Sequence, residues 1–459
     1  MFRRLLGDRH FYARMMALVL PVALQNLLSN SLALVDNIMV GQLGEISVAA
    51  VGLAGQWSYM INMFFFGASS GAAVLIAQYY GAGDGVGVRQ SYGLSVLTMM
   101  AVALPMMAVS LLFPEGSMRI FSQDEAVIQA GVGYLKVMAL SYPLQALAYG
   151  TMSAMRSIGQ VRLPLVAGVV SMLVNVVMNY LLIFGKLGFP AMGASGAAIA
   201  SVLACFVQLV IILISAYRAR SPILGPLGQM LPRGWGFVGK YLRLAMPVIL
   251  NEGLWGVCMS LLSLIFARIG TADYAAYNIM RNLEGVAMSF FWGMGPACSV
   301  LIGSPLGRGD RQTAWDNAVR FLILGPVLAI AAGLIVIILR WPILSCYHVS
   351  QDVLEKANLL LIVFGSLLVF RNFNYFSIVG VLRSGGDTTV AAAIDLGSVW
   401  LIALPMALLG AFVLKLPGHI VFIMITVADV VKSALSLWRI RTRKWMNTLT
   451  TTNKEEVWG

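Results

Sequence analysis

The segment VLIAQYYGAGD at residues 74–84 returns as VLIGSPLGRGD at residues 300–310, which is 226 positions later. Both copies join an apolar run to a polar loop, and the glycines and the final aspartate of that loop fall on the same positions. At the same separation, Pro21 matches Pro247 in the apolar run that opens each half of the chain. We interpret the match as an internal duplication, because a shared GxGD loop rarely arises by chance between unrelated apolar helices.

The composition of the whole chain is that of a polytopic membrane protein. Of its 459 residues, 59% are hydrophobic and 11% are charged, and the mean hydropathy is +0.84. Soluble domains carry roughly 25% charged residues, and a membrane-spanning helix needs about 20 apolar residues. Apolar windows of that length predict helices at about 15–38, 48–72, 91–113, 131–152, 163–185, 194–217, 243–267, 275–300, 318–340, 357–381, 389–412 and 418–438.

The predicted fold is an all-α integral membrane protein with twelve transmembrane helices in two six-helix lobes. The N-terminal lobe covers residues 1–217, a cytoplasmic linker covers 218–242, and the C-terminal lobe with a cytoplasmic tail covers 243–459. A second match, at a separation of 227 residues, pairs Arg156 with Arg383. Because six is an even number, both halves enter the membrane from the same side, so the repeat is parallel about a pseudo-two-fold axis along the membrane normal. Two such lobes are typical of alternating-access transporters.

Basic residues are distributed unevenly between the two sets of loops. The richer set contains Arg3, Arg4, Arg9, Arg14, Arg89, Arg156, Arg162, Arg218, Arg220, Arg233, Lys240, Arg308, Arg311, Arg383 and the run from Arg439 to Lys444. Positive loops favour the cytoplasmic side, so we expect a multi-pass protein of the plasma (inner) membrane with both termini in the cytoplasm. This pattern accounts for the net charge of +12 without a nucleic-acid partner.

The residues of metal, nucleophilic or nucleotide sites are not grouped in the sequence. The four cysteines show no CxxC spacing, and the three histidines lie at segment ends, far from any cysteine. The loop at 81–85 lacks the Lys-Ser/Thr pair of a nucleotide-binding loop. We therefore expect no enzyme activity, no cofactor and no use of ATP, with the energy coming from an ion gradient.

Several stretches resemble the multidrug and toxic compound extrusion (MATE) transporters of prokaryotes. They are PVALQNLLSNSLALVDNIMVGQLGEISVAAVGLAGQ at 21–56, GASSGAAVLIAQYYGAGD at 67–84, MRSIGQ at 155–160, MPVILNEGLWG at 246–256 and VLRSGGDTT at 381–389. The resemblance runs from about residue 10 to about residue 440. It implies twelve helices in two bundles, a monomer, and export of organic cations in exchange for Na⁺ or H⁺.

Ionisable groups at membrane depth are costly, so each one is a candidate for ion coupling. Asp36 lies in the outer part of the predicted first helix, where it can take a proton or a transient Na⁺ with help from amides. Asn175 and Asn179 share a face of the fifth helix. The resemblance implies that some relatives carry a second carboxylate at the position of Asn179. The alternatives are a loop-capping role for Asp36 and helix–helix hydrogen bonding for the two asparagines.

In the C-terminal lobe, Glu252 lies roughly ten residues into the seventh helix, near mid-membrane, and the repeat aligns it with Asn26. The resemblance matches it to a glutamate that binds Na⁺ or H⁺ in relatives, so we expect it to take a proton or a transient Na⁺. Where relatives carry an aspartate in the tenth helix, this chain has Asn372. Asp395 in the eleventh helix is the candidate for that partner role.

Other charges in the C-terminal lobe are expected to pair with one another. Arg281 and Glu284 are three residues apart on one helix face. Arg371, Asp395 and Asp429 form a second group, in which a structural ion pair, with Asp395 neutralising Arg371, is the favoured interpretation.

A cavity for the cargo is predicted from polar, aromatic and methionine side chains. The candidates are Gln25, Asn26, Asn30, Tyr149, Trp255 and Met259. Aromatic rings and methionine suit flat hydrophobic cations through cation–π contacts and adaptable packing. Aromatic residues of membrane helices also serve as core or interface residues, which is the alternative.

These observations predict a secondary active antiporter that exports hydrophobic organic cations or drugs in exchange for Na⁺ or H⁺ by alternating access. One alternative is a lipid-linked saccharide flippase of the same superfamily. Its anionic cargo would favour an arginine-lined cavity, whereas the charges predicted at depth sum to a net negative value. The other alternative is an integral-membrane enzyme, which the lack of a His or Cys constellation disfavours.

Overall fold

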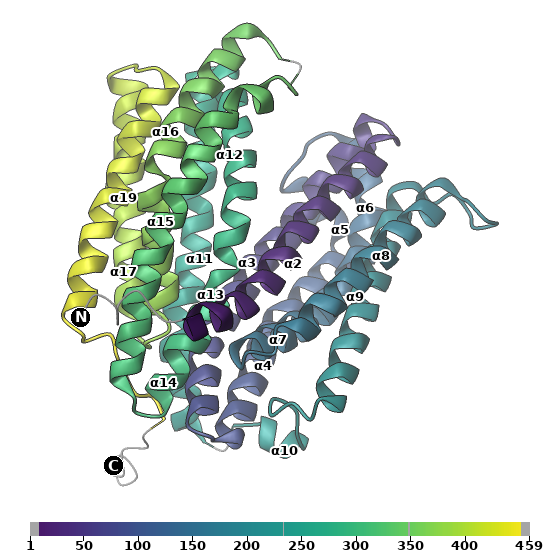
Figure 1. Ribbon diagram of the computed structural model, residues 1–459. Helices are drawn as coiled ribbons and strands as arrows, with labels where there is room; N and C mark the ends of the chain where they lie inside the picture. Colours follow the sequence, from purple (N-terminus) through teal and green to yellow (C-terminus); the bar gives the residue numbers. More distant parts are fainter. Residues whose placement is uncertain (1–8, 233, 348, 451–459) are drawn as a thin grey trace. The chain divides into compact units, whose positions relative to one another are not determined.

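The computed structural model describes residues 9–232, 234–347 and 349–450, and their regular structure is helical throughout (Figure 1). Arg3, Arg4 and Arg233, which the charge pattern assigns to the cytoplasmic side, lie outside the described residues. The first half forms α2 (Arg9–Gly41), α3 (Glu45–Gly81), α4 (Gly85–Leu112), α5 (Pro114–Arg119), α6 (Glu125–Ala139), α7 (Ser141–Ser157), α8 (Arg162–Phe184) and α9 (Gly193–Arg218).

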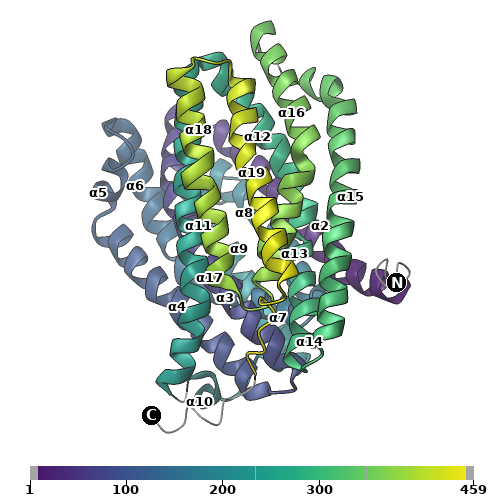
Figure 2. The ribbon, with the colours of Figure 1, turned by 90° about the vertical axis from the view of Figure 1, so that its left-hand side faces the viewer.

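The second half includes several helices that pass through π-helical turns, labelled η. Its elements are α10 (Leu227–Met230), α11 (Trp235–Ile269), α12 (Thr271–Trp292), α13 (Met294–Cys298), η1 (Ser299–Gly303), α14 (Ser304–Gly307), α15 (Arg311–Leu344), α16 (Gln351–Tyr375), η2 (Phe376–Leu382), α17 (Thr388–Ser398), η3 (Val399–Ala403), α18 (Leu404–Leu408), η4 (Leu409–Val413) and α19 (Gly418–Arg441). Within this half, α15, α16 and α19 pack side by side (Figures 1 and 2).

Eleven helices of the described residues are long and apolar enough to cross a membrane. The predicted span at 131–152 is absent from that count because it is divided at Leu140 into α6 and α7. Pro143 lies in the first turn of α7, where it has no N–H to continue the hydrogen-bond ladder of α6. Taken together, α6 and α7 complete the twelve predicted spans.

The two GxGD loops of the repeat have the same local structure. Gly83 and Gly309 have positive φ values of 78° and 81°, which glycine adopts without steric cost. The aspartate that follows each of them caps the next helix. Asp84 Oδ1 accepts hydrogen bonds from the backbone N–H groups of Val86 and Gly87, at 3.0 and 2.9 Å. The repeated motif is therefore a turn followed by a helix cap.

Asp310 provides the second of these caps, because its Oδ1 accepts a hydrogen bond of 3.0 Å from the backbone N–H of Thr313. Hydrogen bonding from Thr313 holds the pKa of the exposed Asp310 carboxyl below its ordinary value. The cap therefore favours the charged form of this side chain.

The chain divides into two compact units. The N-unit comprises Leu20–Ile76 and Gly83–Ala245, and the C-unit comprises Ala77–Ala82, the residues from Met246 onward and the described residues up to Val19. This grouping differs from the predicted lobes, since the start of α2 belongs to the C-unit and the start of α11 to the N-unit. In α2 the boundary between the units follows Val19, two residues before Pro21. In α11 it follows Ala245, two residues before Pro247.

The end of α3 crosses α14 at backbone contact within the C-unit. A Cβ atom on Gly81 would lie 2.1 Å from the carbonyl oxygen of Ser304, and one on Gly307 would lie 1.9 Å from that of Gln78. Ser304 Oγ also donates a hydrogen bond of 3.2 Å to the carbonyl of Ala77. The glycines shared by the two copies of the repeat therefore allow two helices to touch.

The segment after α19 folds onto the same region of the C-unit. Trp445 is fully buried, and a Cβ atom on Gly385 would lie 2.2 Å from its ring. The Asn447 N–H donates to the Gly385 carbonyl at 3.0 Å, and the Leu449 N–H donates to Gln78 Oε1 at 2.8 Å. The tail therefore joins the loop at 383–387 to the end of α3.

Candidate ion-coupling site

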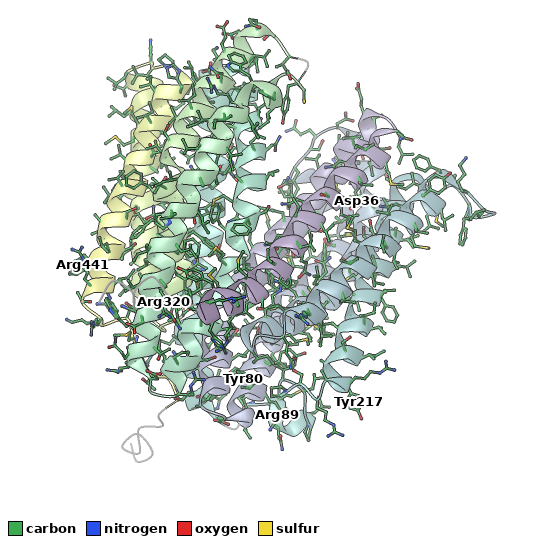
Figure 3. The ribbon with its side chains drawn as sticks, in the orientation of Figure 1. Asp36, Tyr80, Arg89, Tyr217, Arg320 and Arg441 are labelled. Carbon is green, nitrogen blue, oxygen red and sulfur yellow. The ribbon has the colours of Figure 1, made fainter. Side chains whose placement is uncertain are left out.

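A polar array in the N-unit contains the predicted residue Asp36, which is half-buried on α2 (Figure 3). Asn179 Nδ2 on α8 donates a hydrogen bond of 2.6 Å to Asp36 Oδ1 and one of 3.0 Å to Asn175 Oδ1. Asn175 Nδ2 in turn donates to Ser201 Oγ on α9 at 3.3 Å. The structure therefore brings together the three N-terminal residues predicted for coupling, and it adds a serine.

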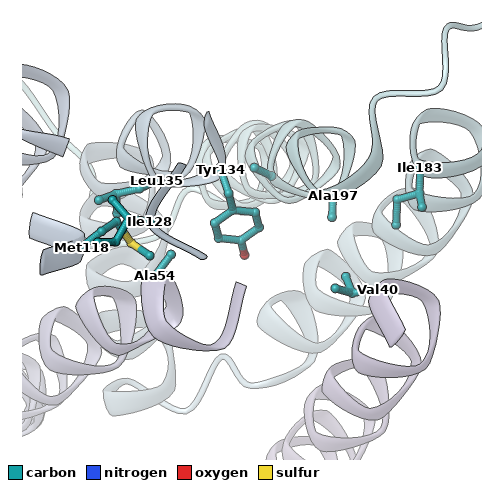
Figure 4. Packing of buried hydrophobic residues seen from close by; sticks show 9 residues of the cluster. Val40, Ala54, Met118, Ile128, Tyr134, Leu135, Ile183 and Ala197 are labelled. Carbon is teal, nitrogen blue, oxygen red and sulfur yellow. The ribbon is translucent and has the colours of Figure 1, made fainter. Parts of the chain in front are cut away.

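An apolar cluster next to the array holds α2 against α8 (Figure 4). Val40 and Ile183 belong to this cluster and are both buried. Each follows one of the bonded pair, Asp36 or Asn179, by four residues, which is about one helical turn. Packing of Val40 and Ile183 thus fixes the approach of the two polar side chains.

The array is rich in oxygen atoms and contains no lysine or arginine among the described residues. Within the described part of the chain, Asp36 forms no ion pair with any Lys or Arg. Asn179 is 1% exposed, and its Oδ1 atom is buried without a hydrogen-bond partner among the described residues. A carboxylate beside an unused amide oxygen can accept a proton or a small cation.

The four cavity residues predicted in the N-unit do not share one environment. Gln25 is buried, and its Oε1 atom accepts a hydrogen bond of 2.6 Å from Arg156 Nη2. Asn26 is partly exposed and Asn30 is exposed, both on α2. Tyr149 is partly buried, with its ring 6.4 Å from that of Phe65. Gln25 forms a contact between two helices, and all four residues remain predictions as cavity residues.

Glu252, the second predicted coupling residue, lies in an ion pair in the C-unit. Arg383 Nη2 donates to Glu252 Oε1 at 2.7 Å, and the Arg383 side chain is 3% exposed. This contact joins residues 131 positions apart in the sequence, as does that between Arg156 and Gln25. Because each accepts a hydrogen bond from the arginine of its own unit, Glu252 corresponds to Gln25 in the structure. The alignment of the repeat instead pairs Glu252 with Asn26, the next residue.

Asp395, also predicted for coupling, is paired with a lysine that the sequence argument did not consider. Lys432 Nζ on α19 donates to Asp395 Oδ1 at 2.6 Å, and Asn251 Nδ2 on α11 donates to Asp395 Oδ2 at 2.9 Å. The expectation that Asp395 neutralises Arg371 is therefore wrong. The Asp395 carboxylate is instead paired with the ammonium group of Lys432 on α19.

Arg371 instead joins two other carboxylates of the C-unit. Its Nη1 atom is bonded to Glu284, and its Nε atom lies 3.5 Å from Asp429 Oδ2. Arg281 Nη1 donates to the same glutamate at 3.1 Å, which confirms that predicted pair. These four side chains form a structural ion network, as expected for Arg371 and Asp429.

The remaining predicted residues of the C-unit form no bonded site. Asn372 is fully buried, and neither of its side-chain polar atoms has a hydrogen-bond partner in the described chain. Trp255 and Met259 are partly exposed on α11. Asn372, Trp255 and Met259 therefore stay predictions for coupling or for cargo binding.

Three cations at depth change the predicted charge balance. Arg156 and Arg383 were assigned to polar loops, but each points to a side chain of a membrane helix. Lys432 is 7% exposed within α19. The expectation that the deep charges sum to a net negative value is wrong. Together with Arg281 and Arg371, these three cations equal in number the five carboxylates Asp36, Glu252, Glu284, Asp395 and Asp429. The two contacts share a separation of 131 residues, and this match can be seen in the sequence only after the pairs are known.

Comparisons with known proteins are consistent with this architecture. The MatE family model matches residues 21–181 and 247–439. A probable multidrug resistance protein NorM of Thermotoga maritima is 26% identical over 433 residues, covering 93% of this chain and 92% of that protein. The multidrug resistance protein MdtK of Edwardsiella ictaluri is 23% identical and covers 85% of this chain and 86% of its own length.

A solved structure of a multidrug resistance MATE family transporter in an outward-facing conformation has the same fold. Its TM-score is 0.85 at 18% identity, and the match covers 96% of this chain and 98% of that one. The twelve-helix, two-lobe fold of a multi-pass membrane protein is thereby confirmed.

Proposed function

This chain belongs to the MatE family, and on that premise we propose that it is a secondary active antiporter. It exports hydrophobic organic cations in exchange for Na⁺ or H⁺, with both termini in the cytoplasm. The names of its relatives as multidrug resistance proteins support this class of cargo. The loops rich in Lys and Arg support the orientation.

The observation that carries the coupling proposal is the environment of Asp36. It is a carboxylate at membrane depth whose described partner is an amide, Asn179, and it has no cationic partner among the described residues. Such a group gains an ion from solution more readily than one that already faces a guanidinium or an ammonium. Asn175 and Ser201 supply further oxygen atoms for a transient Na⁺.

In the proposed cycle, binding of the external ion at Asp36 favours release of the cargo to the outside. The two units then change the side of the membrane to which they are open, and the ion leaves to the cytoplasm as the next cargo molecule binds. Glu252 remains a second candidate for coupling. Its pairing with Arg383 favours a role in positioning α11.

The test uses purified protein in liposomes loaded with a fluorescent organic cation such as ethidium. A Na⁺ gradient and a pH gradient are applied separately, which also identifies the ion. We expect Asp36→Asn to lower ion-driven efflux to the rate of protein-free liposomes. Glu115→Gln removes an exposed carboxylate of the same unit and serves as the control that keeps full activity.

Two results would contradict the proposal. One is full ion-driven efflux by a well-folded Asp36→Asn protein. The other is a wild-type protein that moves no organic cation under either gradient.

A further inference from the structure

Three helices of the C-unit converge on the Asp395 carboxylate. Lys432 Nζ lies 2.6 Å from Oδ1, and Asn251 Nδ2 lies 2.9 Å from Oδ2. The side chains of Lys432 and Asp395 are 9% and 14% exposed. Asn251 is 1% exposed, and its Oδ1 atom is buried without a hydrogen-bond partner in the described chain. A carboxylate and an unused amide oxygen are therefore present here, as they are at Asp36.

The difference from the Asp36 array is that a positive charge already occupies this place. The ammonium contacts the carboxylate oxygen at the distance of a charge-assisted hydrogen bond. Two like charges held this close together repel each other strongly in the low-dielectric surroundings of a buried site. A Na⁺ ion or a second proton is therefore disfavoured while Lys432 is in place.

The charged surroundings keep this arrangement close to neutral. Asp395 also interacts with Arg383, and Lys432 also interacts with Asp429 and Arg371. The nearby groups thus comprise carboxylates and cations from α16, α17, α19 and the loop after η2. No further ion is required to balance Asp395.

The internal repeat has no carboxylate at the corresponding position of the N-unit. At the 227-residue separation of the neighbouring loops, Asp395 corresponds to Gly168 of α8. A Cβ atom on Gly168 would lie 2.9 Å from Gln25 Nε2, so a larger side chain there would have to displace the Gln25 amide that Arg156 contacts. The C-unit accommodates the Asp395 side chain at this position, and Lys432 forms an ion pair with it.

We infer that Lys432 is a built-in counter-ion, a tethered ammonium in the place that a transported cation would take beside Asp395. This inference rests on the proposed antiport function and restricts it. The Asp395 position of the C-unit carries its cation permanently, so the exchanged ion does not bind there. Lys432 thereby acts as a positioning and specificity residue without touching the cargo.

The central test is the neutral pair Asp395→Asn with Lys432→Met in the full-length protein. Neutral groups of similar volume often replace a buried ion pair at little cost, so we expect ion-driven ethidium efflux within about twofold of wild type. If Asp395 itself exchanges ions, the neutral pair loses ion-driven efflux as Asp36→Asn does, and the inference is overturned. Lys432→Arg keeps the charge and is expected to keep efflux.

A second readout uses the single variant Lys432→Met. Removing the ammonium frees Asp395, so the melting temperature in detergent should rise with NaCl relative to choline chloride at equal ionic strength, or with acidification. Adding Asp395→Asn should abolish this response. An unchanged response in Lys432→Met would overturn the inference, since it means that Lys432 excludes no ion.

The two proposals fail in different ways. If the wild-type protein shows no ion-driven efflux, the antiport function fails, and the melting experiment still decides whether Lys432 excludes an ion from Asp395. If Lys432→Met cannot be purified folded, the neutral pair and Lys432→Arg decide the matter.

Discussion

The N-unit and the C-unit share a repeated helical scaffold and differ in the partners of the carboxylates within it. In the N-unit, Asp36 faces amides and a hydroxyl, whereas in the C-unit Glu252 and Asp395 face Arg383 and Lys432. The capped GxGD loops are alike in both units, and so are the contacts that span 131 residues. Duplication has thus preserved the backbone geometry, while the polar interior has diverged.

The paired contacts at 131 residues show how small that divergence is at one point. Arg156 meets the neutral Gln25, and Arg383 meets the charged Glu252, at 2.6 and 2.7 Å. Removal of an amide's partner and removal of a carboxylate's partner have different costs, because a buried unpaired charge is more expensive than a buried unpaired dipole.

The largest expected effect therefore separates these two arginines. Arg383→Met leaves Glu252 unpaired and should lower the free energy of unfolding by about 3–5 kcal/mol. Arg156→Met leaves an amide oxygen unpaired and should cost about 1–3 kcal/mol. Denaturant titration in mixed micelles measures both. Equal losses would show that the charge on Glu252 is not what distinguishes the two units.

A second pair of substitutions compares the segments that follow the sixth and twelfth spans. In the N-unit, a Cβ atom on Gly93 would lie 2.0 Å from the Met230 carbonyl oxygen, and in the C-unit one on Gly385 would lie 2.3 Å from that of Trp445. Each Gly→Ala change should cost about 1–3 kcal/mol by overpacking. Thermal unfolding would reveal the loss.

Gly253→Ala on α11 is the control for this pair, because no described atom outside its own helical turn lies within 4 Å of the added Cβ atom. It should be neutral or slightly stabilising, since alanine favours a helix. If the Gly93 and Gly385 variants behave like this control, the two segments do not pack as tightly as the structure indicates.

A smaller effect is expected at the helix caps. Asp84→Ala removes two hydrogen bonds to backbone N–H groups and Asp310→Ala removes one, at a cost of about 1 kcal/mol each. The two losses, measured by thermal unfolding, should be similar in size. A loss confined to one of the two variants would show that the caps are not equivalent features of the repeat.

The smallest effect concerns pH at Asp310. Hydrogen bonding from Thr313 lowers the pKa of this carboxyl in the folded protein. Its stabilising contribution is therefore present above the ordinary carboxyl pKa of about 3.9 and is lost as the pH falls through the lowered value. Asp310→Asn should show a flatter loss of melting temperature on acidification than wild type. A parallel loss would contradict the assignment.

The membrane spans were predictable because an apolar helix must fill the bilayer without help from distant residues. The span at 131–152 was predicted as one helix, and its break at Leu140 depends on the single residue Pro143. The assignment of the opening turns of α2 and α11 to the opposite unit was not predictable. Hydropathy indicates that a segment lies in the membrane, but it does not indicate which other helices that segment packs against.

The candidate site was predictable for Asp36 and Asn179, since the resemblance indicated both helices. The partners of Glu252 and Asp395 were not. Arg383 stands next to a polar loop in the sequence, and Lys432 lies three residues after Asp429, which suggests an intrahelical pair. Arg383 and Lys432 both contact residues of other helices. The spacing of residues along the sequence does not predict such contacts.

The unit boundaries beside Pro21 and Pro247 have a consequence for expressing the chain in parts. Each unit contains the opening turns of the helix that the other unit continues. Cutting the chain in the linker between α9 and α11 therefore separates the opening turns of these helices from the units to which they belong. We expect the two halves, expressed separately, to fold only when they are brought together.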